Sequence, residues 1–319
     1  MTFETETVLD RRRMRRRLSF WRSAAIAGLA LAFGLLAFGG ERISDLAASH
    51  QIARVTVEGT ITEDRDQLLL LKRLRDAGHV EALLVFVNSP GGTTAGGESL
   101  FQALRNVAEK KPVVAQFGTV AASAGYIVGL GTDHIVSHGN TITGSIGVLA
   151  QWPEVSALLD KIGVKVNEVK SGELKAEPSP FKPMDAGGRQ VVQNTIDDGF
   201  RWFLSLVEQR RGIIAANVPG LVEGRIFSGR EALERKLVDE IGGETEAVRW
   251  LEEKRGVTKD LKVIDWKPVR EGTWGLPNAM AELAAYVLGA GAGQLARLVG
   301  RDATIGTLGL DGLVSVWQP

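Results

Sequence analysis

Apolar residues from position 52 to position 169 follow two alternating patterns. Short, nearly continuous apolar runs have the length of buried strands, and the segments between them carry apolar residues at three- and four-residue steps, as helices do. Strands are predicted at residues 52–61, 82–88, 112–118, 133–137 and 164–169, and helices at residues 67–77, 95–110, 122–130 and 152–163. This alternation predicts an α/β fold in which helices flank a parallel sheet.

A longer helical pattern begins at residue 185. Apolar residues recur at helical spacing over residues 185–211, which predicts one long helix with one buried face. These residues are Val192, Ile196, Phe200, Phe203, Leu204 and Val207. Farther along, Ser228 and Glu231 have the spacing of a capping box, which predicts a short helix ended by Gly242 and Gly243.

Residues 267–319 depart from this rhythm and are interpreted as a C-terminal extension. Residues 279–300 are rich in small residues and weakly amphipathic. Their charges and glycines favour packing against a partner subunit over a second contact with the membrane. The apolar tail at residues 308–319 follows.

The first forty residues have the pattern of a membrane anchor. Residues 1–22 form a basic N-terminus with six arginines between Arg11 and Arg17. Residues 23–40 carry no charge, and a helix of that length spans roughly 27 Å, near the hydrocarbon thickness of a bilayer. The basic flank keeps the N-terminus in the cytoplasm and sends the main domain, residues 50–266, across the membrane. A cleaved signal peptide is the alternative, although its apolar region is usually shorter.

Composition narrows the function classes. Thirty-eight basic residues balance thirty-eight acidic ones, so nucleic acid is not an expected partner. The chain has no cysteine, which excludes disulfides, a thiolate nucleophile and cysteine-ligated zinc. No metal or cofactor is expected.

Two glycine-rich segments follow predicted strands. Asn88 to Gly92 reads NSPGG, where Gly91 and Gly92 leave backbone amides free to point at a bound group, as an oxyanion hole requires. Ser123 lies at the entrance to the next helix among small residues, so the amide of Ala124 would help to stabilise an oxyanion. Taken alone, NSPGG reads equally well as a plain turn and Ser123 as a helix N-cap.

A polar loop carries three lysines, Lys170, Lys175 and Lys182. A lysine serves as a general base only when it is neutral, which requires desolvation, and most loop lysines are solvated surface charges. The sequence pattern by itself does not select one of the three.

These segments together resemble the signal peptide peptidase A family, a group of Ser/Lys peptidases with the Clp protease and crotonase type of fold. The resemblance covers residues 52–243 and includes NSPGG, SAGY, GSIGV, KSGELKAEPSPFKPM and GRIFSGREALERKLVDEIGG. It implies Ser123 as nucleophile, Lys175 as general base, and Gly91 or Gly92 with Ala124 as oxyanion hole. Ala124 and Ala176 replace a glycine and an aspartate common in the family, and neither change removes a required functional group.

The resemblance also implies a setting. The short form of the family forms ring-like homo-oligomers in which the serine and the lysine meet across a subunit boundary. We therefore expect a single-pass protein of the bacterial inner membrane, anchored in lipid, with its catalytic domain on the periplasmic or extracytoplasmic side. Its expected substrates are remnant signal peptides or other small hydrophobic peptides.

Three alternatives remain at this point. Asp133, His134 and His138 follow Ser123 closely enough to suggest a Ser/His/Asp peptidase. In a crotonase-like enzyme the NSPGG amides would instead polarise an acyl-CoA thioester, although a membrane anchor argues against that chemistry. The third alternative is a catalytically silent membrane scaffold.

Overall fold

The computed structural model describes residue 21, residues 49–268 and residues 314–316. The chain divides into two units, and the larger one consists of Gln51–Asp76 with Val80–Pro319. The predicted anchor at residues 23–40 and the predicted helix at residues 279–300 lie outside the described residues. None of the helices in the described part of the chain combines the length and apolar character that crossing a membrane requires.

A nine-stranded mixed sheet forms the centre of this larger unit, with the main strand order β6-β5-β3-β2-β1-β8. β4 pairs with β3 and β7, and β9 pairs with β2. The strands are β1 (Gln51–Ile61), β2 (Val80–Thr93), β3 (Val113–Ala122), β4 (His134–Ser137), β5 (Ile142–Gly144), β6 (Ile226–Ser228), β7 (Glu240–Ile241), β8 (Lys262–Asp265) and β9 (Val314–Val316). The pairs β5–β6 and β2–β9 are antiparallel, whereas the predicted sheet was parallel throughout.

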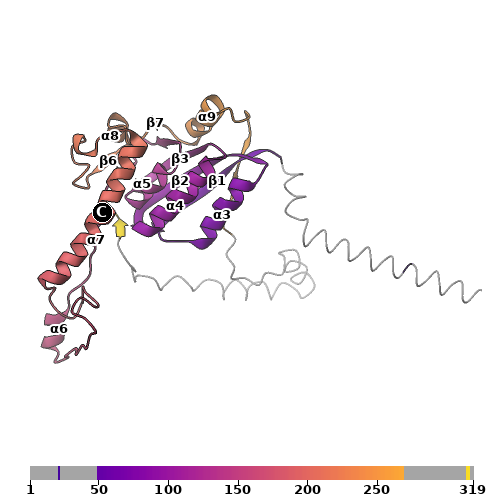
Figure 1. Ribbon diagram of the computed structural model, residues 1–319. Helices are drawn as coiled ribbons and strands as arrows, with labels where there is room; N and C mark the ends of the chain where they lie inside the picture. Colours follow the sequence, from indigo (N-terminus) through magenta and orange to yellow (C-terminus); the bar gives the residue numbers. More distant parts are fainter. Residues whose placement is uncertain (1–20, 22–48, 269–313, 317–319) are drawn as a thin grey trace, which may run out of the picture. The chain divides into compact units, whose positions relative to one another are not determined.

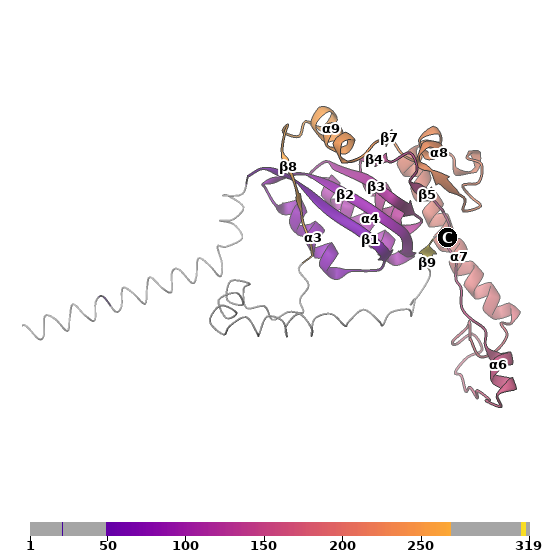
Figure 2. The ribbon, with the colours of Figure 1, turned by 180° about the vertical axis from the view of Figure 1, so that it is seen from behind.

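Helices cover both faces of the sheet (Figures 1 and 2). Adjacent residues of a strand point to opposite faces, so Leu84 and Val114 lie on one face with Leu251 of α9 (Glu244–Arg255), in one apolar cluster. The other face packs against α3 (Arg65–Asp76), α4 (Thr94–Ala108) and α5 (Ala124–Leu130). Burial on both faces explains why the central strands are continuously apolar.

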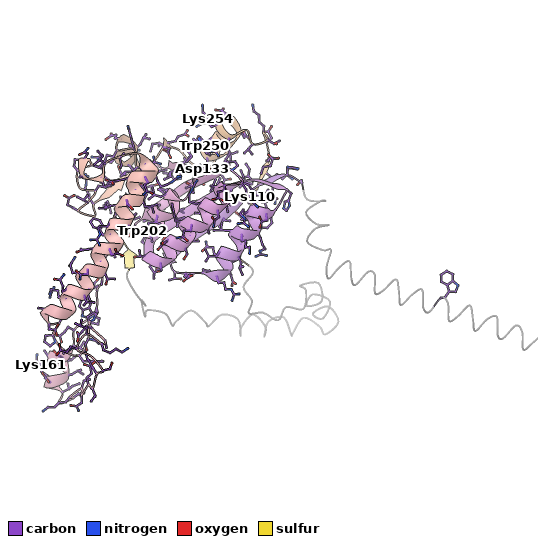
Figure 3. The ribbon with its side chains drawn as sticks, viewed as in Figure 1. Lys110, Asp133, Lys161, Trp202, Trp250 and Lys254 are labelled. Carbon is purple, nitrogen blue, oxygen red and sulfur yellow. The ribbon has the colours of Figure 1, made fainter. Side chains whose placement is uncertain are left out.

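The long helix α7 (Ala186–Arg211) joins this core to an arm, which we define as residues 149–200. Phe203 and Val207, in the C-terminal half of α7, are fully buried, and Arg210 Nε donates to the carbonyl of Leu130 at the end of α5 (2.9 Å). The N-terminal half continues into the arm, which also contains α6 (Ser156–Lys161). Figure 3 labels Lys161 on α6 at the end of the arm away from the sheet, and Trp202 where α7 reaches the core.

Four expectations about elements need correction. No strand forms at residues 164–169, where Val169 is fully exposed and no neighbouring strand is available for pairing. β2 continues through NSPGG to Thr93, so that segment is the end of a strand and not a turn. The capping box at Ser228 starts α8 (Gly229–Glu234) as predicted, but the helix ends well before Gly242. In α7, the predicted face is fully buried only in its C-terminal half.

Candidate active site

Ser123 occupies a sharp junction between β3 and α5. Its backbone has φ 56° and ψ −119°, a conformation that is unfavourable for a residue with a Cβ. The side chain makes no helix-capping hydrogen bond, so the N-cap interpretation is wrong in its usual sense. A strained strand-to-helix turn is the backbone geometry of a nucleophile elbow, and here the serine at the turn is almost fully buried, with 1% of its surface exposed.

Neighbouring segments hold this junction in place. The Ser123 amide donates to the carbonyl of Gly144 (2.9 Å), and the Ser123 carbonyl accepts from the amides of Tyr126 (2.9 Å) and Ile127 (3.0 Å). Tyr126 is fully buried, and its hydroxyl donates to the carbonyl of Leu237 (2.7 Å). The GSIGV motif therefore contributes to the site through a backbone contact, which its residue types alone did not indicate.

The NSPGG segment lies against the first turn of α5. A Cβ added to Gly125 would lie 2.8 Å from the carbonyl oxygen of Ser89, and one added to Gly97 would lie 3.3 Å from the Cβ of Ala124. Such close approaches are possible only because these positions carry no side chain. The structure thus brings together Ser123, Ala124 and the C-terminal end of β2.

Backbone amides near Ser123 differ in their availability. Ala124 is the first residue of α5, where an amide has no partner within the helix. The amide of Gly91 donates to the Ser89 hydroxyl (3.1 Å), which itself donates to the carbonyl of Gly59 (2.6 Å). Gly92 passes so close to Ile61 that an added Cβ would lie 1.8 Å from its carbonyl oxygen. Of the two glycines predicted for the oxyanion hole, Gly91 therefore has an amide that is already engaged.

The C-terminal tail pairs with this same end of β2. Residues 314–316 form β9, which lies antiparallel to β2 with Val314 opposite Thr93 and Val316 opposite Gly91. The strand pairing β2–β3 ends before this point, at Ser89 opposite Ala121. An edge of β2 near Ser123 therefore accepts an extended chain segment.

Lys175 lies on the loop between α6 and α7, in the arm. Side chains of this loop pack on the first turn of α7, where Gly188 is close to Glu177. That turn is separated from Phe203, at the core, by about 22 Å of helix at a rise of about 1.5 Å per residue. A single chain therefore does not bring Lys175 beside Ser123.

The three lysines of this loop have different surroundings. Lys170 Nζ contacts Glu177 Oε1 (3.0 Å) and Glu168 Oε2 (3.2 Å), and Lys182 forms a close ion pair with the same Glu177 oxygen. Hydrogen bonding to Glu177 raises the pKa of Lys170, which makes that lysine a poorer base. Lys175 is exposed and makes no ion pair with a residue that the structure describes.

The histidines lie elsewhere on the sheet. His134 pairs with Val114, so along β3 it lies about 30 Å from Ser123 at a rise of about 3.3 Å per residue. Its ring stacks on Trp250 (4.6 Å between centroids) and its Nε2 faces Glu240 (3.4 Å). Asp133 accepts a hydrogen bond from Arg105 (3.0 Å), and Figure 3 shows Asp133 and Trp250 toward the α9 side.

His138 is closer to the junction than His134 but is still distant from it. It follows Ser137, which pairs with Phe117 in the middle of β3, and its ring lies beside Gly243. The geometry therefore opposes a Ser/His/Asp triad within one chain.

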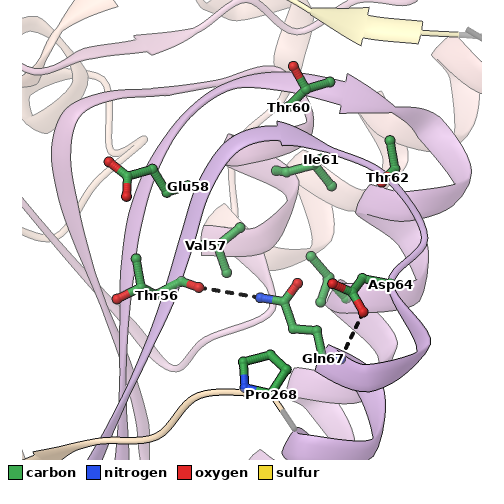
Figure 4. A pocket seen from close by; sticks show the side chains of 10 residues that line it. Thr56, Val57, Glu58, Thr60, Ile61, Thr62, Asp64, Gln67 and Pro268 are labelled. Atoms are coloured by element: carbon green, nitrogen blue, oxygen red, sulfur yellow. Dashed lines mark hydrogen bonds between the residues drawn. The ribbon is translucent and has the colours of Figure 1, made fainter. Parts of the chain in front are cut away.

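Two cavities border β1, and none of the predicted site residues lines them. One, of about 330 Å³, is lined by Thr56, Glu58, Asp64, Gln67 and neighbours (Figure 4). There the Gln67 side chain donates to the Thr56 carbonyl (3.4 Å), and Asp64 accepts from the Gln67 amide (3.1 Å). The Gln67 side chain and the Asp64 carboxylate thus already have hydrogen-bond partners within the protein, so we do not assign this cavity to a ligand. Across the described parts of the chain, no cluster of three or more His, Asp or Glu residues suits a metal ion.

Comparison with known proteins gives a consistent family assignment. Residues 105–258 match the model of peptidase family S49. A protein of Synechocystis sp. named as protease slr0021 is 36% identical over 217 residues, covering 67% of this chain and 78% of that protein. A protein of Methanocaldococcus jannaschii named as protease MJ0651 is 31% identical, covering 81% of this chain and 84% of that protein.

An Enterococcus faecium relative carries the more specific description of signal peptide peptidase SppA. It is 31% identical over 259 residues, which covers 76% of this chain and 75% of the relative. This agrees with the resemblance drawn from the NSPGG, SAGY and KSGELK segments. The chain belongs to peptidase family S49 and is a serine peptidase of the SppA and protease 4 type.

Proposed function

We propose that this peptidase is a membrane-anchored endopeptidase that cleaves remnant signal peptides or other small hydrophobic peptides with Ser123 and Lys175. The observation that carries the proposal is the strained backbone of Ser123 at the β3–α5 junction, beside the amide of Ala124 and the C-terminal end of β2. Strain of this kind persists where the surrounding structure imposes it, and such sites are often functional.

The proposed reaction proceeds through an acyl-enzyme. Lys175 takes the proton of Ser123 Oγ as that oxygen attacks the peptide carbonyl, and the amides of Ala124 and Gly92 stabilise the resulting oxyanion. Collapse of the tetrahedral intermediate breaks the C–N bond, and the leaving amine takes the proton back from Lys175. Water, activated by the same lysine, then releases the acyl group and restores Ser123.

A peptide is the substrate that the site geometry favours. The edge of β2 at Gly91 to Thr93 already pairs with an extended segment of this chain, β9, in the antiparallel direction. A peptide bound in the same way would align its backbone by ladder hydrogen bonds, as in β-augmentation. An acyl-CoA thioester has no backbone for such a ladder, which disfavours the crotonase-like alternative.

A second copy of the chain is the proposed source of the lysine. Among the residues that the structure describes, the arm carries nine of the sixteen exposed large hydrophobic residues, including Leu158, Ile162 and Phe181. Exposed apolar surface of this extent is typical of an interaction site. We infer a homo-oligomer in which one protomer's arm contacts its neighbour and places Lys175 at the neighbour's Ser123.

The proposed location follows from the sequence of the N-terminus. An uncharged segment at residues 23–40 behind a cluster of arginines would anchor the protein in the bacterial inner membrane. The catalytic domain would then face the periplasmic or extracytoplasmic side.

The test is hydrolysis of a fluorogenic apolar peptide by the wild-type protein, Ser123→Ala and Lys175→Ala, with Lys170→Ala and Lys182→Ala as matched controls. We expect Ser123→Ala and Lys175→Ala each to lower kcat/KM by at least about 1,000-fold, because a nucleophile and its base act as a unit. The two control lysines take no part in proton transfer and bind Glu177 of the same loop, so their substitution should cost no more than about 100-fold. Full activity of Lys175→Ala would refute the proposed base, and full activity of Ser123→Ala would refute the nucleophile.

A further inference from the structure

Glu177 is the most buried charged side chain of the loop that carries Lys175. Its side chain is 1% exposed, whereas those of Lys170 and Lys182 are 14% and 39% exposed. Glu177 Oε1 binds both lysines, and Glu177 Oε2 is buried without a hydrogen-bond partner among the described residues. A buried carboxylate is costly unless it is paired, so this arrangement needs both lysines.

The backbone around Glu177 fixes where Lys175 lies. The Lys175 amide donates to the Gly172 carbonyl (3.1 Å), and the Glu177 amide donates to the Leu174 carbonyl (3.4 Å), so two consecutive turns surround Lys175. Ala176, between Lys175 and Glu177, has φ 62°, in the left-handed region. A residue other than glycine in that region needs support from its surroundings.

Glu177 also attaches the loop to α7. A Cβ added to Gly188, in the first turn of α7, would lie 3.3 Å from the Cβ of Glu177. The Asp185 side chain caps the same turn by accepting from the Gly188 amide (2.7 Å). The loop is thus held at the start of a long rigid helix, two residues from Lys175.

We propose that Glu177 is a positioning residue for Lys175: it binds Lys170 and Lys182, closes the loop on α7, and leaves Lys175 as the lysine presented to Ser123. This rests on the proposed Ser/Lys mechanism and answers which of three lysines in one loop acts as the base. It assigns a role to a residue that the sequence motif contains but that takes no part in proton transfer. Lysines that pair with a buried carboxylate are fixed in place by it.

The experiment is a double-mutant cycle between Glu177 and Lys175 in the full-length protein. Glu177→Gln keeps the shape of the side chain and removes its charge, and Glu173→Gln makes the same charge change at an exposed position of the same loop. We measure the rate at which a fluorophosphonate labels Ser123 and the kcat and KM for an apolar peptide. A displaced catalytic group typically costs up to about 100-fold in rate.

We expect Glu177→Gln to lower kcat and the labelling rate by about 10- to 100-fold with KM within about twofold, and Glu173→Gln to change neither. In the Lys175→Ala background, Glu177→Gln should cause no further loss, because Glu177 acts only through that lysine. Equal losses in both backgrounds would overturn the proposal. So would unchanged kcat in Glu177→Gln.

The same cycle separates this inference from the proposed function. If Lys175→Ala alone labels as fast as wild type, the Ser/Lys mechanism fails, whatever Glu177 does. If Lys175→Ala is inactive and Glu177→Gln is fully active, only the positioning role fails.

Thermal melting and gel filtration check the folding and assembly of each variant, with Glu177→Ala as a second substitution. Loss of folding or assembly in both Glu177 variants would assign Glu177 to structure and also overturn the inference.

Discussion

Backbone strain at Ser123 is the residue-scale feature that sets this site apart from an ordinary helix start. At φ 56° the serine Cβ crowds its own backbone, at a cost of about 1–3 kcal/mol for such conformations. The surrounding hydrogen bonds, to Gly144 on one side and from Tyr126 and Ile127 on the other, hold it there. The surrounding structure therefore holds Ser123 in a conformation that lowers the stability of the fold.

This strain predicts that Ser123→Gly is more stable than Ser123→Ala, although both are inactive. Glycine adopts positive φ without steric cost, and its greater entropy in the unfolded chain offsets part of the gain. We expect Ser123→Gly to exceed Ser123→Ala by about 1 kcal/mol in the free energy of unfolding, measured by denaturant titration. Ser171→Gly against Ser171→Ala, at an exposed loop position, is the control and should not show that order. Equal stability of the two Ser123 variants would mean that the turn is not strained.

Motifs predicted the position of Ser123 but not its conformation, because φ depends on contacts from distant segments. Gly144 of β5 and Ser89 of β2 contact the turn that contains Ser123 and its first helical residues. The sequence around Ser123 does not predict these contacts. Likewise, three lysines in one loop were equivalent by spacing. Their distinction appears only when Glu177 is seen to bind two of them.

At the scale of elements, the arm depends on ion pairs that respond to pH. Lys182, and then Lys170, hold the pKa of Glu177 below its ordinary value of 4.5. Because this pKa is lowered in the folded protein, the pairs stabilise the loop above pH 4.5, and that stabilisation is lost as pH falls through the folded-state pKa.

Amide hydrogen exchange of residues 170–182 measures this loss. After correction for intrinsic rates, protection should be constant from pH 7 to above the ordinary carboxyl pKa of 4.5 and should fall in more acidic solution. In Glu177→Gln the protection should be lower throughout and no longer follow this acid transition. An acid transition that persists in Glu177→Gln would assign it to a different carboxylate.

β9 raises a second question about elements, since it occupies the edge of β2 that the proposed substrate needs. Deleting residues 314–319 should lower KM for an apolar peptide with little change in kcat, because a tethered competitor for the edge has been removed. The length control is a variant in which residues 314–319 are replaced by Gly and Ser, so that the chain keeps its length. This variant should behave like the deletion. If KM is unchanged in both, the tail does not compete with substrate.

The predicted helices and strands are correct where the apolar residues are buried in the core, and they are wrong where apolar residues are exposed. β1, β3 and the helices between β1 and β3 were expected within a few residues, and β2 was expected except for its last five residues, since continuous apolar runs and helical spacing report a packed core. Residues 164–169 have the same apolar character but lie exposed in the arm. Their apolar pattern is explained more readily by contact with another molecule than by a strand of this sheet.

The whole molecule, as a single chain, keeps Lys175 and Ser123 apart, and this separation is the strongest argument for shared active sites. The arm extends from the core along α7 (Figures 1 and 2). It carries exposed apolar side chains that a partner surface would bury. A second copy satisfies both requirements, because a symmetric oligomer presents every arm to an identical neighbour. The catalytic unit would then be the contact between two protomers.

Mixing two inactive variants tests this directly. In an oligomer assembled from equal amounts of Ser123→Ala and Lys175→Ala protomers, a site has an intact serine with a chance of one half and an intact lysine from its neighbour with the same chance, so about one quarter of the sites should be complete. We therefore expect turnover to return to about one quarter of the wild-type rate after co-expression, measured with the fluorogenic peptide. Co-expression of Ser123→Ala with the double variant Ser123→Ala/Lys175→Ala should stay inactive. If the first mixture also stays inactive although both variants assemble, each site takes Ser123 and Lys175 from the same chain, and the arm must fold back onto its own core.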